Sequence, residues 1–170
     1  MTPVVLVGLM GSGKSTVGRL VADATGRTLV DVDVTITART GKTVRELWEE
    51  GGEAAYRTLE SEAVHEALAR DDVVLAAPGG AILDPAVRAA LADAFVVWLR
   101  ADPAALGRRV RTGDHRPLLG PDPGADLAAM AAARDGLYEA VADLVIDTGR
   151  HDPDAAARSI VDHLDSARPD

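Results

Sequence analysis

The sequence predicts a three-layer α/β fold, in which helices flank a five-stranded parallel sheet. Five short apolar runs alternate with longer segments whose apolar residues recur at helical spacing, which is the pattern of successive βαβ units. Glycine and aspartate residues cluster where the runs end, at the edge where parallel sheets bind ligands. The length of 170 residues suits one domain, spanning 1–170, with a single core.

The amino-terminal half is expected to hold three strands, each followed by helix. The first strand is predicted at 4–8 and the helix after it at 13–26, where Gly26 is a common helix stop. A second strand at 28–33 precedes a helical stretch that breaks near Gly41. Thr43 and Glu46 have the spacing of a capping box, which begins a helix. The Gly51–Gly52 pair should end or bend that helix. An amphipathic helix at 53–70 leads to the third strand at 73–78.

The carboxyl-terminal half continues the alternation. A short helix at 85–92, with Pro85 in its first turn, precedes a fourth strand at 95–99 and a helix at 102–111. The turn-rich segment 112–124 is expected to form a mobile lid. A helix at 125–142, a fifth strand at 144–147 and a helix at 153–167 complete the predicted fold.

Composition excludes several classes of function. Cysteine is absent, which excludes a disulfide scaffold and a thiol-ligated metal site. The net charge of −9 argues against a general nucleic-acid or membrane surface, and no apolar run approaches the length of a membrane span. The amino terminus has no basic region of the kind that begins a signal peptide. We therefore expect a cytoplasmic monomer that binds small molecules.

Residues 8–16, GLMGSGKST, match the P-loop pattern in full, after a predicted strand and at the start of a predicted helix. Small residues let successive backbone N–H groups surround phosphate oxygens, and the helix N-terminus adds partial positive charge. Lys14, one of two lysines beside 16 arginines, can reach the β- and γ-phosphates, and Ser15 can ligate Mg²⁺. A glycine turn without a ligand is the alternative, which this context disfavours. The pattern predicts ATP binding by Gly11, Ser12, Gly13, Lys14, Ser15 and Thr16.

Asp31 and Asp33 end the second predicted strand two residues apart, so the period of a strand places both on one face. Two carboxylates beside a phosphate site indicate metal coordination and deprotonation of a substrate hydroxyl. The alternative is that they only cap the following helix.

Three further segments are ambiguous when each is taken alone. Arg57 and Glu60, three residues apart, could be a helix-surface ion pair, Arg116 could be any surface arginine, and residues 133–148 could be an ordinary helix and strand. Their order, however, resembles the shikimate kinase family of small P-loop metabolite kinases, from residue 4 to about 163. The resemblance is carried by GLMGSGKSTVGRLVA, DVDVTITARTGKTVRELWEEGGEAAYRTLESE, PGGAIL, RPLLG, ARDGLYEAVADLVIDT and RHDP.

The resemblance implies a P-loop kinase fold and ATP-dependent phosphorylation of the shikimate 3-hydroxyl, in chorismate and aromatic amino-acid biosynthesis. It implies three catalytic residues. Lys14 would neutralise the transferring phosphate, Asp33 would accept or orient the hydroxyl proton, and Arg116 would arrive on the lid to stabilise phosphoryl charge.

The resemblance also implies the binding residues. Ser15 and Asp31 would hold Mg²⁺, while Arg109 and Pro153 would flank the adenine. Arginine suits carboxylate recognition because its planar fork pairs with both oxygens. The remaining residues implied at the acid substrate are Arg57 and Arg134 for its carboxylate, Glu60 to orient Arg57, Gly79 and Gly80 for close approach of main chain, and Trp48 and Tyr56 as an aromatic wall where the family commonly has Phe.

Two departures leave alternatives open. The family usually has three glycines in the middle turn, but here the first position is Pro78, which lacks an N–H and fixes φ near −65°. Gly136 stands where the family tends to have proline. A related kinase for another small hydroxy acid or cyclitol, of the gluconate type, is therefore the second hypothesis. A nucleotide-binding module without turnover is the third, and the set of Lys14, Asp31, Asp33 and Arg116 argues against it.

Overall fold

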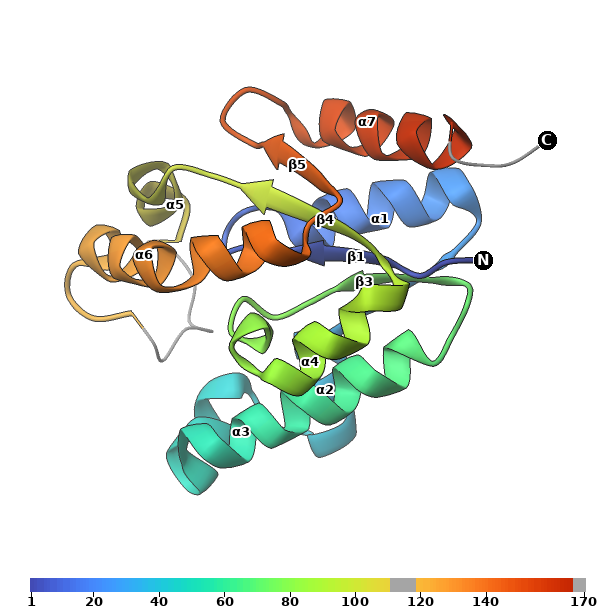
Figure 1. The fold of residues 1–170 in the computed structure, drawn as a ribbon. Coiled ribbons are helices and arrows are strands. Elements are labelled where there is room, and N and C mark those ends of the chain that lie inside the picture. The colour runs from blue at the N-terminus through green and yellow to red at the C-terminus, as the bar shows by residue number, and fades with distance from the viewer. Residues whose placement is uncertain (111–118, 167–170) are drawn as a thin grey trace.

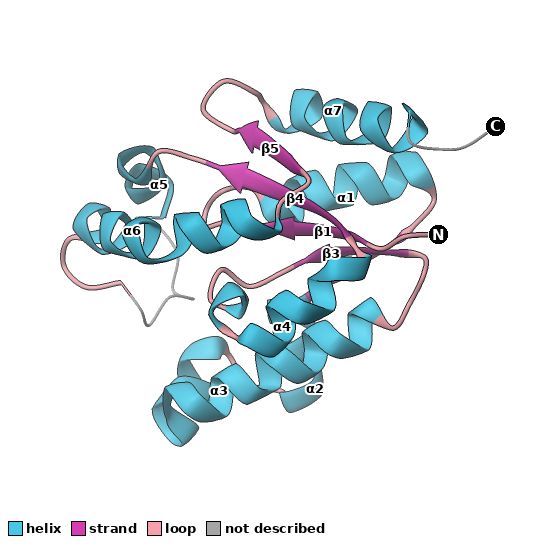
Figure 2. Ribbon diagram, in the orientation of Figure 1, coloured by secondary structure: helices cyan, strands magenta, loops and turns pink. Residues whose placement is uncertain are grey.

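The computed structural model describes residues 1–110 and 119–166. Its strands are β1 (Val4–Val7), β2 (Thr28–Asp31), β3 (Val73–Ala76), β4 (Phe95–Arg100) and β5 (Leu144–Asp147). They form one parallel sheet in the order β2-β3-β1-β4-β5, drawn in magenta in Figure 2. The predicted five-stranded parallel sheet is therefore confirmed.

The described helices cover both faces of this sheet. They are α1 (Lys14–Thr25), α2 (Val32–Thr40), α3 (Val44–Leu68), α4 (Pro85–Ala90), α5 (Pro103–Val110), α6 (Pro123–Val141) and α7 (Pro153–Ser166), with short 3₁₀ turns η1 (Ala81–Leu83) and η2 (Leu91–Asp93). Figure 1 shows α1 and α7 packed together on one side of the sheet, whereas α3, α4 and α6 lie on the other.

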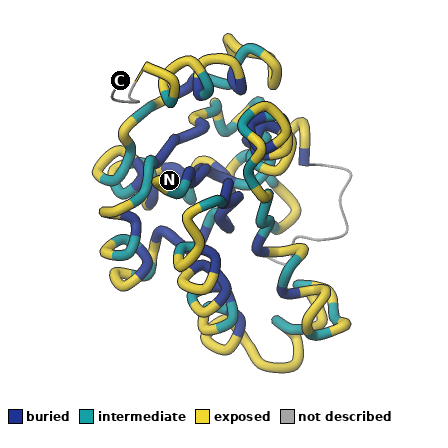
Figure 3. The backbone as a smooth tube through the Cα atoms, turned by 90° about the vertical axis from the view of Figure 1, so that its right-hand side faces the viewer, coloured by how far each residue is buried: buried dark blue, intermediate teal, exposed yellow. Residues whose placement is uncertain are grey.

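The two faces bury separate apolar clusters because strand side chains alternate in direction. Val4 and Leu6 of β1 pack with α1 and α7, whereas Val5 and Val7 pack with α3, α4, α5 and α6. The central strands are therefore buried on both sides, as the dark inner segments of Figure 3 show. This double burial fixes the sheet, and its carboxyl edge becomes a stable base for functional loops.

The second strand ends two residues earlier than its apolar pattern predicts. β2 stops at Asp31 and α2 begins at Val32, so Asp33 lies in the first turn of a helix rather than on a strand. The Asp31 carboxylate accepts a hydrogen bond from the Val34 N–H at 3.4 Å. Because this cap satisfies a free amide at the helix N-terminus, the chain turns into helix at that point. The expectation that both carboxylates share one strand face is wrong.

The capping box and the bend predicted near the glycine pair are both present in α3. The Glu46 N–H donates to Thr43 Oγ1 at 3.2 Å, and the Thr43 N–H donates to Glu46 Oε2 at 2.7 Å. Gly52 interrupts the helix with φ 76° and ψ 178°, in the region that favours glycine. α3 therefore consists of two helical segments that meet at a break.

The carboxyl-terminal end of the segment expected to form a lid is helical. α6 begins at Pro123, and the Asp122 side chain caps it by accepting from the Ala125 N–H at 3.1 Å. Pro123 and Gly124 therefore belong to a helix. Residues 112–118 of the predicted lid lie outside the described residues.

Candidate active site

A cavity of 780 Å³ lies at the carboxyl ends of β1, β2 and β3. The loop after β1, the start of α1, the end of β2, helices α2 and α3, the turn after β3 and one residue of α6 line it. Segments far apart in the sequence therefore converge on one volume, which is large enough for a small-molecule ligand.

The loop between β1 and α1 has the backbone geometry that its glycines predict. Gly8 has φ 141°, and a Cβ at this position would lie 2.6 Å from the backbone oxygen of Leu99. Gly13 has φ 97° and directly precedes α1. The Lys14 ammonium donates to the backbone oxygens of Gly8 and Leu9, at 2.9 Å each. The lysine is thus held along the inside of the loop that would receive phosphate.

Five of the six P-loop residues predicted to bind ATP line the cavity. They are Gly11, Gly13, Lys14, Ser15 and Thr16. Ser12 is only 2% exposed and does not line it, and its N–H donates to the Leu9 oxygen at 3.2 Å, which closes the turn of the loop. Ser12 therefore contributes to the shape of the loop.

Ser15 and Asp31 meet at the metal site that the sequence predicts. The Ser15 hydroxyl donates to Asp31 Oδ2, and both residues line the cavity beside the P-loop. A hydroxyl and a carboxylate are hard oxygen donors of the kind that Mg²⁺ prefers, usually with substrate phosphates as further ligands. The residues present therefore fit Mg²⁺. The described residues contain no cluster of three or more His, Cys, Asp or Glu that could hold a metal ion unaided.

Asp33 enters the same cavity from the first turn of α2. The Tyr56 hydroxyl donates to Asp33 Oδ1 at 2.8 Å. Tyr56 is 3% exposed, and its ring lies 5.7 Å from that of Trp48, tilted by 50°. The predicted pair of aromatic residues is therefore in contact, and it reaches the carboxylate through the tyrosine hydroxyl.

Arg57 and Glu60 form a partly buried ion pair rather than a surface pair. Arg57 Nη1 donates to Glu60 Oε2 at 2.5 Å, and the Glu60 side chain is only 4% exposed. The Arg57 guanidinium also lies 5.5 Å from the centre of the Trp48 ring, within range of a cation–π contact. Burial raises the pKa of Glu60 to about 7, against the opposing effect of Arg57. The pair leaves Arg57 22% exposed where it lines the cavity.

The turn after β3, which holds Gly79 and Gly80, lies between the P-loop and Arg57. A Cβ at Gly79 would meet the Gly8 oxygen at 3.2 Å, and a Cβ at Gly80 would lie 1.9 Å from Arg57 Nη1. The Tyr138 hydroxyl donates to the Gly79 oxygen at 2.6 Å, which ties the turn to α6. Burial raises the pKa of Tyr138 to about 12, so that hydroxyl stays protonated.

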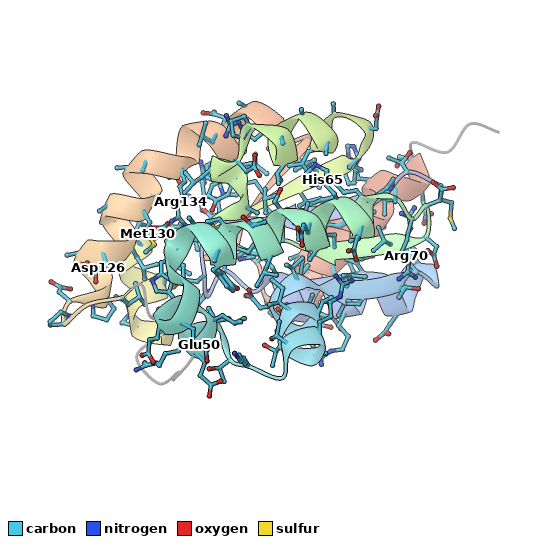
Figure 4. The ribbon with its side chains drawn as sticks, turned by 90° about the horizontal axis from the view of Figure 1, so that it is seen from below. Glu50, His65, Arg70, Asp126, Met130 and Arg134 are labelled. Atoms are coloured by element: carbon cyan, nitrogen blue, oxygen red, sulfur yellow. The ribbon has the colours of Figure 1, made fainter. Side chains whose placement is uncertain are left out.

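Arg134 approaches the cavity from α6 and is 7% exposed. Figure 4 shows it one turn beyond Met130 on that helix. Its positive charge opposes the rise in the pKa of Glu60 that burial causes. Two guanidinium groups and one carboxyl group therefore share this end of the cavity.

Pro78 is buried and also lines the cavity, and its oxygen accepts from the Ala81 N–H at 3.1 Å.

The residues predicted at the adenine and on the lid are not placed at this cavity by the part of the chain that the structure describes. Arg109 is exposed on α5 and Pro153 is exposed at the start of α7, and neither lines the cavity. Arg116 lies outside the described residues. Their assignment to the nucleotide stays a prediction.

Comparison with known proteins assigns the chain to a family. The model of the shikimate kinase family matches residues 10–165. Shikimate kinase of Mycobacterium tuberculosis is 45% identical over 166 residues, which cover 97% of this chain and 94% of the relative. The chain belongs to the shikimate kinase family. A shikimate kinase of Thermobifida fusca is 44% identical over 163 residues, covering 96% and 95% of the two chains.

Solved structures agree with membership of the shikimate kinase family. Shikimate kinase from Acinetobacter baumannii, solved in complex with shikimate, superposes with a TM-score of 0.95 at 34% identity, over 100% of this chain and 96% of the other. A gluconokinase from Sinorhizobium meliloti has a TM-score of 0.62 at 18% identity, over 98% of both chains, which shows a shared fold alone.

Among the helices that the structure describes, none has an apolar stretch of the length that a membrane span requires.

The structure adds cavity residues that motif analysis of this shikimate kinase family member missed. Val34, Thr37 and Ala38 line the cavity from one face of α2. Their spacing of three and four residues places them on one face of a helix. That spacing becomes a usable signal once the helix is known to begin at residue 32. Tyr138 lies within a recognised motif, but only its contact with Gly79 indicates what it does.

Proposed function

We propose that this protein transfers the γ-phosphoryl group of ATP to the 3-hydroxyl of shikimate, in chorismate and aromatic amino-acid biosynthesis. The products are shikimate 3-phosphate and ADP. The observation that carries the proposal is the convergence of a complete P-loop, Asp33 and two cavity-lining arginines on one volume, in a chain of the shikimate kinase family.

The nucleotide occupies the P-loop side of the cavity in this proposal. Backbone N–H groups of the loop and the Lys14 ammonium bind the β- and γ-phosphates. Lys14 exchanges the Gly8 and Leu9 oxygens, which it contacts here, for phosphate oxygens. Mg²⁺ held by Ser15 and Asp31 supplies neutralisation of phosphate charge when bound.

The acid occupies the opposite side, against the two arginines. Arg57 and Arg134 bind the shikimate carboxylate, and the ion pair with Glu60 fixes the direction of Arg57. The Trp48–Tyr56 wall contacts the ring, and Gly79 and Gly80 give the close approach of main chain that larger residues would block.

Asp33 lies between these two sides and acts on the substrate hydroxyl. Its carboxylate accepts the hydroxyl proton as the substrate oxygen bonds to the γ-phosphorus and the bond to the β,γ-bridging oxygen breaks. The electron pair of that bond leaves with ADP. Phosphoryl transfer requires alignment and charge neutralisation more than covalent catalysis, and these fixed groups supply both.

We also propose the roles that the described residues leave untested. Arg116 stabilises phosphoryl charge from a lid that ends before α6 begins at Pro123, while Arg109 and Pro153 flank the adenine. The enzyme is a cytoplasmic monomer with one domain, 1–170.

A coupled assay of ADP release with shikimate, quinate and gluconate tests the function. We expect shikimate to give the highest kcat/KM, with release dependent on Mg²⁺. Higher kcat/KM with gluconate would support the hypothesis of a related kinase. No release above the rate with ATP alone, for any of the three acids, would support the binding module.

Asp33→Asn tests the role of the carboxylate. The variant should keep its affinity for ATP while kcat falls at least 100-fold, the usual range for loss of a general base. Turnover close to the wild-type rate would remove Asp33 from the mechanism.

A further inference from the structure

The Tyr56 hydroxyl reaches the Asp33 carboxylate from a different helix. Asp33 lies in the first turn of α2, whereas Tyr56 follows the Gly52 break in α3. The hydroxyl donates to Asp33 Oδ1 at 2.8 Å, and both residues line the cavity. The contact therefore joins the carboxylate assigned to proton transfer with a buried side chain from 23 residues further along the chain.

The ring of Tyr56 is fixed independently of its hydroxyl. It is 3% exposed, and it packs at 5.7 Å from the Trp48 ring. A phenylalanine could fill this place equally well, so the hydroxyl is not needed for the wall. A buried hydroxyl needs a hydrogen-bond partner, and the partner found here is Asp33.

The hydroxyl is a permanent donor to Asp33. The pKa of Tyr56 is raised above its ordinary value by burial first, and then by the negative charges of Asp33 and Glu60. Tyr56 therefore stays neutral throughout the pH range of an enzyme assay, and its proton remains directed at the carboxylate. The terminal torsion of a carboxylate is broad, so a donor held in one place favours one orientation of the carboxylate plane.

We propose that Tyr56 is a positioning residue, whose hydroxyl holds the plane of the Asp33 carboxylate in the orientation that receives the substrate proton. This inference rests on the proposed function of Asp33. Tyr56 does not exchange a proton with the substrate, and it acts only through Asp33. Its aromatic ring forms part of the wall of the acid site, and its hydroxyl orients the Asp33 carboxylate.

Tyr56→Phe separates these two roles because it removes the hydroxyl and keeps the ring. We expect kcat to fall about 10-fold, within the 10- to 100-fold range set by a hydrogen bond to a charged group. The KM values for the acid and for ATP should stay within twofold of wild type. A contact that merely joined α2 to α3 would instead change stability and KM, so the split between kcat and KM distinguishes positioning from a structural role.

The second measurement is a double-mutant cycle with Asp33→Asn. Tyr56→Phe should leave the residual rate of Asp33→Asn within twofold, because the group that it positions is already gone. Rates are expressed per ADP-binding site, counted by titration calorimetry, so that an incompletely folded sample does not imitate a lower kcat. A wild-type kcat in Tyr56→Phe, or an equal loss in the Asp33→Asn background, would overturn the proposal.

The cycle is run with whichever of shikimate, quinate and gluconate the wild-type protein phosphorylates fastest. Failure with shikimate then counts against the proposed substrate alone, whereas independence of the two substitutions counts against the role of Tyr56.

Discussion

Glu60 should make the free energy of unfolding of this protein fall as pH rises, and substitution of this one residue should remove that dependence. The side chain is 4% exposed, and burial raises its pKa to about 7 from the ordinary 4.5, although Arg57 opposes the rise. Between these two values the folded protein holds a proton that the unfolded chain has released. Stability from this group is therefore fully present below pH 4.5, and it is lost as pH rises through 7.

The magnitude follows from the same two values. The difference between 4.5 and about 7, at about 1.4 kcal/mol for each pKa unit, corresponds to roughly 3 to 4 kcal/mol over the whole interval. Glu60→Gln keeps an oxygen that can accept from Arg57 but has no proton to lose. Relative to this variant, the wild-type protein should lose roughly 2 to 3 kcal/mol of unfolding free energy between pH 5 and pH 8.

Urea unfolding of the ligand-free proteins at pH 5, 6.5 and 8 measures this difference directly. Glu139→Gln is the matched control, because Glu139 is exposed on α6 and its loss removes the same formal charge from the surface. A wild-type minus Glu60→Gln difference that stays constant with pH would refute the reasoning. A Glu60→Gln variant that becomes relatively less stable at pH 8 would show that attraction to the arginines outweighs burial.

Two glycine substitutions give contrasting predictions. A Cβ at Gly80 would lie 1.9 Å from Arg57 Nη1, so Gly80→Ala should displace the guanidinium and raise the KM for shikimate about 10-fold, the loss of roughly one charged hydrogen bond. Steady-state kinetics should show an unchanged KM for ATP, and an unchanged KM for shikimate would exclude the contact with substrate. At Gly136, within α6, an added Cβ meets no atom within 4 Å, so Gly136→Ala should stabilise the protein by about 0.5 to 1 kcal/mol. Thermal unfolding measures this gain as a rise in Tm of about 1 to 4 °C, and a fall would mean that this position needs glycine.

The elements that depend on local pattern could be predicted. The P-loop follows from the spacing of Gly8, Gly13 and Lys14, and the capping box at Thr43 follows from one glutamate three residues later. The end of β2 could not be placed, because Asp31 fits the end of a strand and the cap of a helix equally well. Only the bond from the Val34 N–H distinguishes the two.

The amino-acid sequence by itself determined the layers of the fold, the phosphate loop, the family resemblance and most residues of the cavity. Apolar period, glycine spacing and capping residues act over a few positions, so one segment contains the whole signal. Only the tertiary structure decided which groups act together. Tyr56 on Asp33, Tyr138 on the Gly79 oxygen and the Arg57 guanidinium above Gly80 are contacts between separate segments. Such contacts depend on how helices pack against one sheet, and no local pattern encodes that arrangement.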